Sequence, residues 1–233
     1  MKLEIGRNAD FEIRREQLVS ARVADLSVLF ISDLHFNSQS EDIVTRLYAC
    51  VLSLSPSLIL LGGDYVDNRK GLRYLERVLA SIAPLAPVFA IPGNHDYFFG
   101  IGKIRSAVHA HEVVWLENSN SILEINGSRI GIANNPHIHS SEKTDLNILC
   151  LHKPVDPEHF HLHYDLAFAG HLHGGQFVFW ENRKGLFPGR LFYKWNIRKA
   201  VCGNCLYLVS KGLGDTLPIR YNCVKDVIFV KVK

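Results

Sequence analysis

The sequence predicts an α/β protein built around a layer of parallel strands. Three observations lead to this prediction. Short apolar runs rich in β-branched and aromatic residues recur along the chain, amphipathic helical patterns separate the early runs, and short turns join the later ones. The 233 residues are enough for a sizeable core, and we find no linker, internal repeat or low-complexity tract. We therefore expect one domain covering residues 1–233.

The strands are predicted by apolar runs that are too short for helices. Five runs are expected to form strands buried on both faces: Leu26–Ile31, Leu58–Leu61, Val88–Ile91, Ile148–Leu151 and Leu166–Ala169. Five later runs are expected to form strands joined by short turns: Val113–Leu116, Ile122–Ile125, Arg129–Ala133, Leu206–Val209 and Val227–Val232. Asn126-Gly127 is a hairpin signal between two of these later strands.

Two helical patterns lie between the first three strands. The first follows a candidate N-cap at Ser40 and places five apolar residues on one face: Ile43, Val44, Leu47, Val51 and Leu52. The second pattern does the same with Leu72, Leu75, Val78, Leu79 and Ile82. The resulting β-α-β-α-β alternation predicts a parallel sheet.

Composition and charge exclude several classes of protein. Lys plus Arg exceeds Asp plus Glu by 26 − 23 = 3, so we expect no nucleic-acid partner. The longest charge-free stretches contain prolines and fall short of the roughly 20 residues that span a bilayer. Residues 1–25 carry ten charges and no apolar h-region, so we expect no signal peptide. Five cysteines, most of them inside apolar runs, favour reduced thiols in a cytoplasmic protein.

Polar residues of one chemical kind follow five of the predicted strands. In chain order they are Asp33 and His35, then Asp64 and Asp67, then Asn94, His95 and Asp96, then His152, then His171 and His173. Ligands of open α/β sheets gather beyond the carboxyl ends of strands, so these side chains can converge although they are far apart in sequence. We expect His171 and His173, two residues apart on extended backbone, to point to the same side.

Carboxylates, an amide and imidazoles together are typical ligands of divalent metals. Seven such groups suit two ions roughly 4 Å apart, as in two-metal hydrolases. A single Asp or His at a strand end is more often a hydrogen-bonded core group or a turn former. Five clusters in this order, each behind a buried strand, are hard to explain by structure alone and favour a metal centre.

The same residues resemble the five motif blocks of the calcineurin-like metallophosphoesterase family, over about residues 27 to 175. The blocks are Asp33-x-His35, Gly63-Asp64-x-x-Asp67, Gly93-Asn94-His95-Asp96, His152 and Gly170-His171-x-His173. The resemblance implies two mixed β-sheets packed as a sandwich, flanked by helices, with a dimetal site at one edge.

The resemblance also implies a role for each residue. Asp33, His35 and His173 would hold the first ion, Asn94, His152 and His171 the second, and Asp64 would bridge them. His95 would be the acid near the leaving-group oxygen, oriented by Asp96. Two divalent ions, manganese first with iron, zinc or magnesium as alternatives, would supply an activated water as the nucleophile. The expected activity is hydrolysis of a phosphodiester or pyrophosphate bond.

The tail segment "VSKGLGDTLPIRYNC" (209–223), which contains Arg220, narrows the resemblance. It is similar to a segment in a branch of membrane-associated phosphodiesterases, some of which are UDP-2,3-diacylglucosamine pyrophosphohydrolases. The branch implies a lipid-linked or amphiphilic substrate such as UDP-2,3-diacylglucosamine. Soluble nucleotides or other small phosphoesters remain an alternative substrate class, and a non-catalytic scaffold with the same fold remains an alternative function.

We call residues 176–199 the basic aromatic segment. It holds seven aromatic residues and six cations against one anion, Glu181. One interpretation is aromatic packing at a sheet edge with Arg and Lys directed outward. The other is a loop beside the metal centre that contacts an anionic, amphiphilic substrate or the inner face of a membrane. We therefore expect substrate contacts from Arg190 and Lys194 in this segment and from Arg220 in the tail.

Overall fold

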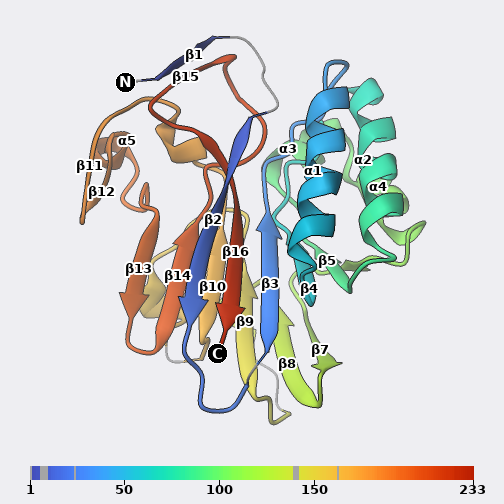
Figure 1. Ribbon diagram of the computed structural model, residues 1–233, viewed down its shortest axis with the longest axis vertical. Coiled ribbons are helices and arrows are strands. Elements are labelled where there is room, and N and C mark those ends of the chain that lie inside the picture. The colour runs from blue at the N-terminus through green and yellow to red at the C-terminus, as the bar shows by residue number, and fades with distance from the viewer. Residues whose placement is uncertain (1, 6–9, 24, 139–141, 162) are drawn as a thin grey trace.

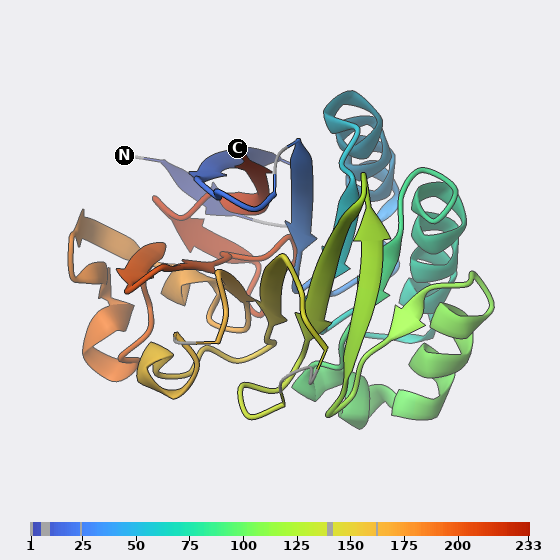
Figure 2. The ribbon, with the colours of Figure 1, turned by 90° about the horizontal axis from the view of Figure 1, so that it is seen from below.

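The fold is a sandwich of two six-stranded mixed sheets (Figures 1 and 2). The computed structural model of the chain describes residues 2–5, 10–23, 25–138, 142–161 and 163–233. Two short two-stranded sheets, β1 with β15 and β11 with β12, lie beside the sandwich. They consist of β1 (Leu3–Ile5), β15 (Ile219–Tyr221), β11 (Val178–Asn182) and β12 (Gly185–Pro188).

The first sheet has the strand order β2-β16-β3-β4-β5-β6. Its strands are β2 (Phe11–Leu18), β16 (Lys225–Val232), β3 (Leu26–Ile31), β4 (Leu58–Leu61), β5 (Val88–Ala90) and β6 (Val114–Trp115). The four strands from β3 to β6 are parallel, while β16 runs antiparallel to β3 and parallel to β2. The carboxyl ends of β3, β4 and β5 therefore meet at one edge.

The second sheet has the strand order β13-β14-β10-β9-β8-β7. Its strands are β13 (Lys199–Cys202), β14 (Cys205–Val209), β10 (Leu166–Ala169), β9 (Leu146–Cys150), β8 (Ser128–Ala133) and β7 (Asn120–Ile125). The central strands β14, β10, β9 and β8 are parallel, and antiparallel strands close both sides. The antiparallel pair β7 and β8 confirms the hairpin predicted at Asn126-Gly127.

Helices cover the outer face of the first sheet, at the right of Figure 2. The long ones are α1 (Glu41–Leu54), α2 (Arg69–Ile82) and α4 (Ile101–His109), and the short α3 (Asn94–Phe99) adjoins α4. Helix α5 (Gly189–Phe192) lies next to β12 instead, and 3-10 turns stand at Pro157–His159 and His173–Gly175. No helix of the described residues is long and apolar enough to cross a bilayer.

Alternating strand residues build two cores. Val28 and Phe30 of β3 point into the space between the sheets, where the Phe30 ring stacks on Phe168 of β10 with ring centroids 4.9 Å apart. Leu29 and Ile31 point the other way, into the core beneath the helices. Burial on both faces explains why β3, β4 and β10 read as uninterrupted apolar runs.

The predicted elements differ from the structure mainly where the sequence is amphipathic. The bounds of β3, β4 and β10 are as predicted, whereas strand β2 was not predicted because charged residues interrupt its apolar pattern. Leu52 is 46% exposed, because the buried face of α1 is already filled by residues such as Leu47 and Val51. Ser40 stands at the N-cap of α1 but makes no side-chain cap bond.

Candidate metal centre

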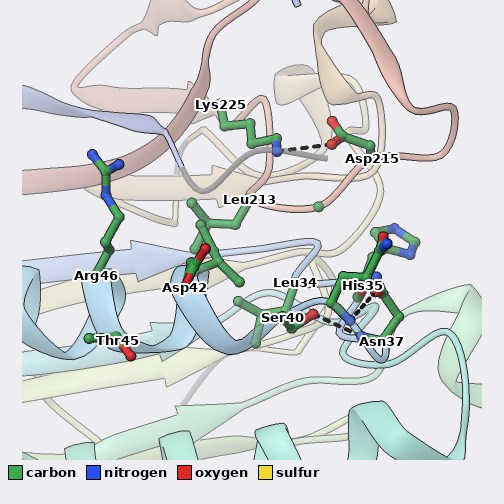
Figure 3. Close-up of a pocket in the computed structure, with 13 residues that line it drawn as sticks. Leu34, His35, Asn37, Ser40, Asp42, Thr45, Arg46, Leu213, Asp215 and Lys225 are labelled. Carbon is green, nitrogen blue, oxygen red and sulfur yellow. Dashed lines mark hydrogen bonds and ion pairs between the residues drawn. The ribbon is translucent and has the colours of Figure 1, made fainter. Parts of the chain in front are cut away.

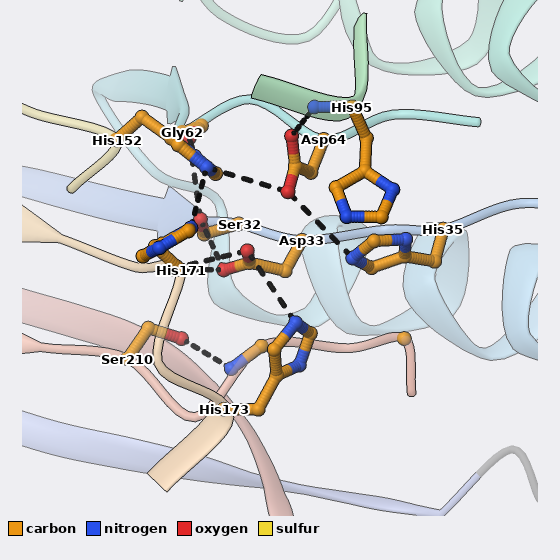
Figure 4. Close-up of polar contacts among 12 residues, drawn as sticks. Ser32, Asp33, His35, Gly62, Asp64, His95, His152, His171, His173 and Ser210 are labelled. Carbon is orange, nitrogen blue, oxygen red and sulfur yellow. Dashed lines mark hydrogen bonds and ion pairs between the residues drawn. The ribbon is translucent and has the colours of Figure 1, made fainter. Parts of the chain in front are cut away.

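All seven predicted ligands lie at the edge where the carboxyl ends of β3, β4, β5, β9 and β10 meet. Figure 4 shows the Asp33 and Asp64 carboxylates among the surrounding imidazoles. Three groups have donor atoms within 4.8 Å of one another, and two of them consist of predicted ligands: Asp33 with His35 and His173, and Asp64 with His152 and His171. The third group is His35 with Asp67 and His95. The amide oxygen of Asn94 lies 2.9 Å from His152 Nε2 and so adjoins the second group. The structure therefore brings together both predicted ligand sets.

Backbone conformation aims these side chains. Five of the seven predicted ligands have a positive φ: Asp33, His35, Asp64, His171 and His173, with values between 44° and 70°. Residues with a Cβ rarely adopt this left-handed conformation, and such strain gathers at functional sites. The sequence suggested that His171 and His173 lie on extended backbone. Their positive φ values show that they do not. A tight turn directs each ring, and the 3-10 turn begins at His173.

Two glycines let the backbone approach the carboxylates closely. A Cβ on Gly93 would lie 2.2 Å from Asp64 Oδ1, and one on Gly170 would lie 2.3 Å from Asp33 Oδ2. Neither distance is compatible with a side chain, because real non-bonded contacts of Cβ atoms start above 3 Å. Glycine in the motifs at 93 and 170 is thus required by the packing of the two acidic residues.

A hydrogen bond from Nδ1 of His152 directs its other ring nitrogen into the site. His152 Nδ1 lies 2.8 Å from the carbonyl oxygen of Gly62, and a carbonyl can only accept, so Nδ1 carries the proton. The other nitrogen, Nε2, faces Asp64 Oδ2 at 3.3 Å and His171 Nδ1 at 3.2 Å. Donor atoms of three groups thus converge on one point, an arrangement that a cation stabilises.

His35 shows the same arrangement in the other group. Its Nδ1 lies 2.7 Å from Asp67 Oδ1 and donates to that carboxylate. Its Nε2 is buried and has no hydrogen-bond partner within the described part of the chain. A buried nitrogen without a partner is costly, and metal coordination would remove that cost. The donors of this group therefore fit a divalent cation.

The pKa values report the same negative environment. Burial works against charge on His152, yet its hydrogen bond to Asp64 and the charges of Asp33 and Asp64 raise its pKa to about 9. Burial likewise disfavours charge on Asp64, but His152 and His35 lower its pKa to about 2. Hydrogen bonds from His95, His171 and Ser32 to the two carboxylates offset part of this charge, and a proton on imidazole offsets more. A divalent ion would take over that compensating charge.

His173 is held in its neutral, ligand-competent form. Burial, together with the charges of His35 and Arg220, outweighs the pull of Asp33 and lowers the pKa of His173 to about 4. Arg220 is 2% exposed and donates to Asp215, at 2.5 Å, and to the carbonyl oxygens of Cys223, Lys211 and Gly214. Arg220 was expected to contact the substrate, but this buried position does not suit that role. Its guanidinium nitrogen Nη2 lies 3.4 Å from His173 Nδ1 and supports the turn that carries His173.

Asp96 also differs from the role that the motif implied. Its carboxylate is fully buried and accepts from the backbone N–H groups of Gly93, Asp64 and Tyr65 at 2.7 to 2.9 Å. No hydrogen bond joins it to the His95 ring within the described residues. Burial raises the pKa of Asp96 to about 6, although those N–H donors oppose the shift. Asp96 therefore fixes the loop that carries Asp64 rather than the imidazole of His95.

The remaining predicted residues divide between the centre, which His95 adjoins, and the basic aromatic segment, which carries Arg190 and Lys194. The ring of His95 stands edge-on to His35, with centroids 4.8 Å apart, and its backbone N–H donates to Asp64 Oδ1 at 2.8 Å. Lys194 pairs with Asp156 at 2.5 Å, and Arg190 donates to the carbonyl of Lys184. Asp67, which received no predicted role, supports His35. The sequence did contain a signal for this role, because Asp67 is the second acidic residue of the block "GGDYVD".

Comparisons with known proteins agree with this geometry. Residues 26–175 match the family model of calcineurin-like phosphoesterases. The protein YpbG of Bacillus subtilis, itself uncharacterized, is 29% identical over 84% of this chain and 76% of its own. Phosphodiesterase YaeI of Escherichia coli is 25% identical over 95% of this chain and 88% of its own.

Among solved structures, NAD nucleotidase from Haemophilus influenzae is similar with a TM-score of 0.50 and 15% identity, over 81% of this chain and 45% of that one. This likeness concerns the fold alone. The family model covers more than half of the chain and spans every motif from Asp33 to His173. The chain therefore belongs to the calcineurin-like phosphoesterase family and is a phosphoester hydrolase.

Proposed function

We propose that the chain hydrolyses a phosphodiester or pyrophosphate bond with two divalent ions, manganese being the first choice. Asp33, His35 and His173 hold one ion, Asn94, His152 and His171 hold the other, and Asp64 bridges them. The observation that carries this proposal is the convergence of carboxylate and imidazole donor atoms on two points, with His35 and His152 each fixed by a hydrogen bond on the opposite ring nitrogen.

When bound, the ions activate a water and clamp the phosphoryl oxygens for in-line attack. The protein positions those ions through its turns, and Asp67 and the Gly62 carbonyl fix the orientation of two imidazoles. His95 stands at the side of the centre, where its ring makes no hydrogen bond to the described residues, and donates a proton to the leaving-group oxygen. Ser and Cys nucleophiles are not needed for this chemistry.

Metal content and activity together test the dimetal proposal. Purified protein is stripped with a chelator and reloaded with Mn²⁺, Fe²⁺, Zn²⁺ or Mg²⁺, and bound metal is counted by elemental analysis. We expect two ions per chain, hydrolysis of bis(p-nitrophenyl) phosphate or a nucleoside diphosphate ester, and a higher melting temperature. Ions that bind the folded state at 100 times their dissociation constant stabilise it by about 2.7 kcal/mol per site. Hydrolysis that persists in metal-free protein would exclude the proposal.

The substrate is proposed to be lipid-linked or otherwise amphiphilic, and the basic aromatic segment supports this. Instead of a loop it forms the β11–β12 hairpin and α5, which pack on the turn of His173–Gly175 through Asn196. Leu191 and Phe192 of α5 are 70% and 79% exposed, so packing against the sheet does not account for them. Exposed apolar residues beside exposed cations are the combination that binds anionic lipid surfaces.

Cations surround these apolar residues. Arg183 and Lys184 are exposed in the turn between β11 and β12, and the carbonyl oxygen of Lys184 accepts from Nε of Arg190 in α5. Figure 1 shows this hairpin beside α5. Each cation near an anionic leaflet contributes about 1 kcal/mol. We therefore place the lipid part of the substrate, and peripheral contact with the inner face of a membrane, on this side of the metal centre.

Liposome sedimentation tests the lipid contact. Leu191→Ser/Phe192→Ser should lose binding to vesicles containing anionic lipid, and Arg183→Gln/Lys184→Gln should lose it in a salt-dependent manner. Val19→Ser is the matched control, because Val19 is 88% exposed outside the segment. Turnover of soluble bis(p-nitrophenyl) phosphate should remain as in the wild type. Binding that is equal in all four proteins would remove the membrane contact and leave soluble phosphoesters as the substrate class.

A further inference from the structure

The hydroxyl of Ser32 contacts Asp33, the proposed ligand that follows it in the chain (Figure 4). Ser32 Oγ lies 2.6 Å from Asp33 Oδ2 and 3.3 Å from the carbonyl oxygen of Gly62. The hydroxyl has one proton to donate, and the carboxylate at 2.6 Å is the stronger of the two acceptors. Ser32 therefore donates its hydrogen bond to Oδ2 of Asp33.

This hydrogen bond makes the two oxygens of Asp33 different. Oδ2 is engaged by Ser32, whereas Oδ1 lies 3.8 Å from Nε2 of His173, an imidazole of the same donor group. The backbone N–H of His171 lies 3.0 Å from both oxygens and does not favour either. Among the hydrogen-bond donors in the described part of the chain, Ser32 alone distinguishes the two oxygens of Asp33.

Asp64 shows the same division with a backbone donor. Its Oδ1 accepts from the N–H of His95 at 2.8 Å, and its Oδ2 lies 3.3 Å from His152 Nε2 and 3.8 Å from His35 Nε2. Each of the two carboxylates thus has one oxygen held by a donor of the protein and the other directed at imidazoles. The donor to Asp64 is a peptide group, whereas the donor that distinguishes the oxygens of Asp33 is a side chain, which a substitution can remove.

Solvent does not reach the hydrogen bond between Ser32 and Asp33. Both residues are 0% exposed, and a Cβ on Gly170 would lie only 2.1 Å from Ser32 Oγ. A cavity of about 490 Å³ lies nearby, between α1 and the loop that carries Leu213 (Figure 3). Its lining includes His35 but neither Ser32 nor Asp33. No water therefore competes with the Ser32 hydroxyl for Oδ2 of Asp33.

We infer that Ser32 is a positioning residue, which directs Oδ1 of Asp33 toward the cation of the first donor group and keeps Oδ2 away from it. A carboxylate can bind a cation through one oxygen or through both. An oxygen that already accepts a short hydrogen bond is the poorer ligand, because the donor engages a lone pair and part of the charge. The inference rests on the proposed dimetal hydrolysis and adds which atom of Asp33 binds.

Ser210 provides a matched control, because it makes the same kind of hydrogen bond to an aspartate that is not a proposed ligand. Ser210 Oγ lies 2.7 Å from Oδ1 of Asp226, and the two residues are 1% and 0% exposed. Asp226 lies outside the donor groups and pairs with Arg14 at 3.0 Å. Ser210→Ala therefore removes a buried bond between a serine and an aspartate, as Ser32→Ala does, but leaves the proposed ligands in place.

Cobalt reports on the ligands without turnover, because the visible absorption of Co²⁺ depends on the number and arrangement of its ligands. Metal-free protein is loaded with Co²⁺ at both sites. In Ser32→Ala, Oδ2 of Asp33 is free to bind beside Oδ1, so we expect a weaker visible absorption as the coordination number rises. Ser32→Thr, which keeps the hydroxyl, and Ser210→Ala should give the wild-type spectrum. A wild-type spectrum in Ser32→Ala would overturn the inference, and this comparison decides even if the methyl group of threonine does not fit.

Metal affinity separates positioning from a general loss of stability. Competition with a chelator should show one of two Mn²⁺ ions bound about 10–100-fold more weakly in Ser32→Ala, the range found for partners of metal ligands. Both alanine variants should lower the melting temperature of the metal-free protein, but only Ser32→Ala should lose affinity. Equal losses of affinity in the two variants would overturn the inference, while dimetal hydrolysis stands. A wild-type protein that binds neither Co²⁺ nor Mn²⁺ would overturn the proposed function instead.

Discussion

The two sheets contribute different chemistry to the metal centre. Loops after β3, β4 and β5 of the first sheet supply both carboxylates, the amide of Asn94 and one imidazole. Loops after β9 and β10 of the second sheet supply imidazoles only, from His152, His171 and His173. Each of the two donor groups nevertheless draws on both sheets. The candidate centre is therefore assembled by the packing of one sheet on the other, and neither sheet alone holds either of the two donor groups.

This division explains the electrostatics of the site. The first sheet brings buried negative charge, with Asp33 and Asp64 at 0% and 1% exposure. The second sheet brings groups that can be neutral or positive at neutral pH. Protons can balance the charge in the absence of metal, as the raised pKa of His152 indicates. Metal binding should displace that proton, so loading should release protons and weaken as the pH falls.

The largest expected effect comes from removing charge on the first sheet. Asp64→Asn keeps the shape of the side chain but takes away the proposed bridging carboxylate. We expect loss of at least one ion and a fall in kcat/KM of more than about 10³-fold, since changes in outer partners alone cost 10–100-fold. Elemental analysis and kinetics measure both. Glu41→Gln, an exposed isosteric control, should leave them unchanged, and two full ions in Asp64→Asn would contradict the bridging role.

His95 should lose rate without losing metal, because it is proposed as an acid and not as a ligand. His95→Asn is expected to lower kcat about 10²–10⁴-fold, the usual scale of proton assistance. The loss should be small for a nitrophenolate leaving group, which needs no proton, and large for an alkoxide. The comparison of the two leaving groups is the measurement. An ion lost from this variant would make His95 part of the ligand set.

A substitution at Asp67 tests whether the first sheet also orients its imidazole ligand, His35. Asp67→Asn replaces the carboxylate that accepts from His35 Nδ1 at 2.7 Å. We expect metal affinity to fall about 10–100-fold, the range found when a supporting partner of a ligating imidazole is changed. Competition with a chelator gives the affinity, and excess metal should restore most of the activity. Failure of excess metal to restore it would show that Asp67 acts on the substrate as well.

The convergence of the candidate ligands was predictable because their chemistry is encoded in side chains at strand ends. Apolar runs located β3, β4 and β10, and the polar residues that follow them converge as parallel strands require. The positions of Asp96 and Arg220 were not predictable in this way. Their partners are largely backbone groups, the N–H of Asp64 and the carbonyls of Lys211 and Gly214, which no pattern of residue types records. The positive φ of His171 was not predictable either, because the backbone conformation of a single residue leaves no pattern of residue types.

The smallest expected effect on activity concerns the support that the tail gives to the second sheet. Asp215 Oδ2 lies 2.9 Å from Lys225 Nζ, and Asp215 Oδ1 accepts a hydrogen bond from Nε of Arg220. Arg220 is the residue whose guanidinium lies beside His173. Burial disfavours its charge, but Arg220 and Lys225 lower the pKa of Asp215 below its ordinary 3.8. The folded state thus holds the carboxylate ionised more firmly than the unfolded state does. Its contribution to stability is present above the ordinary pKa and is lost as the pH falls through the lower, folded value.

Asp215→Asn should therefore be less stable than the wild type at pH 7, and the difference in the free energy of unfolding should shrink as the pH falls below about 4. Denaturant titrations at several pH values measure this difference. Because the ligands themselves are intact, metal affinity and kcat at pH 7 should change less than about tenfold. A stability difference that stays constant down to pH 2 would contradict the lowered pKa. A large loss of metal would instead show that the tail is needed to orient His173. The second sheet would then not supply its imidazoles independently of the tail.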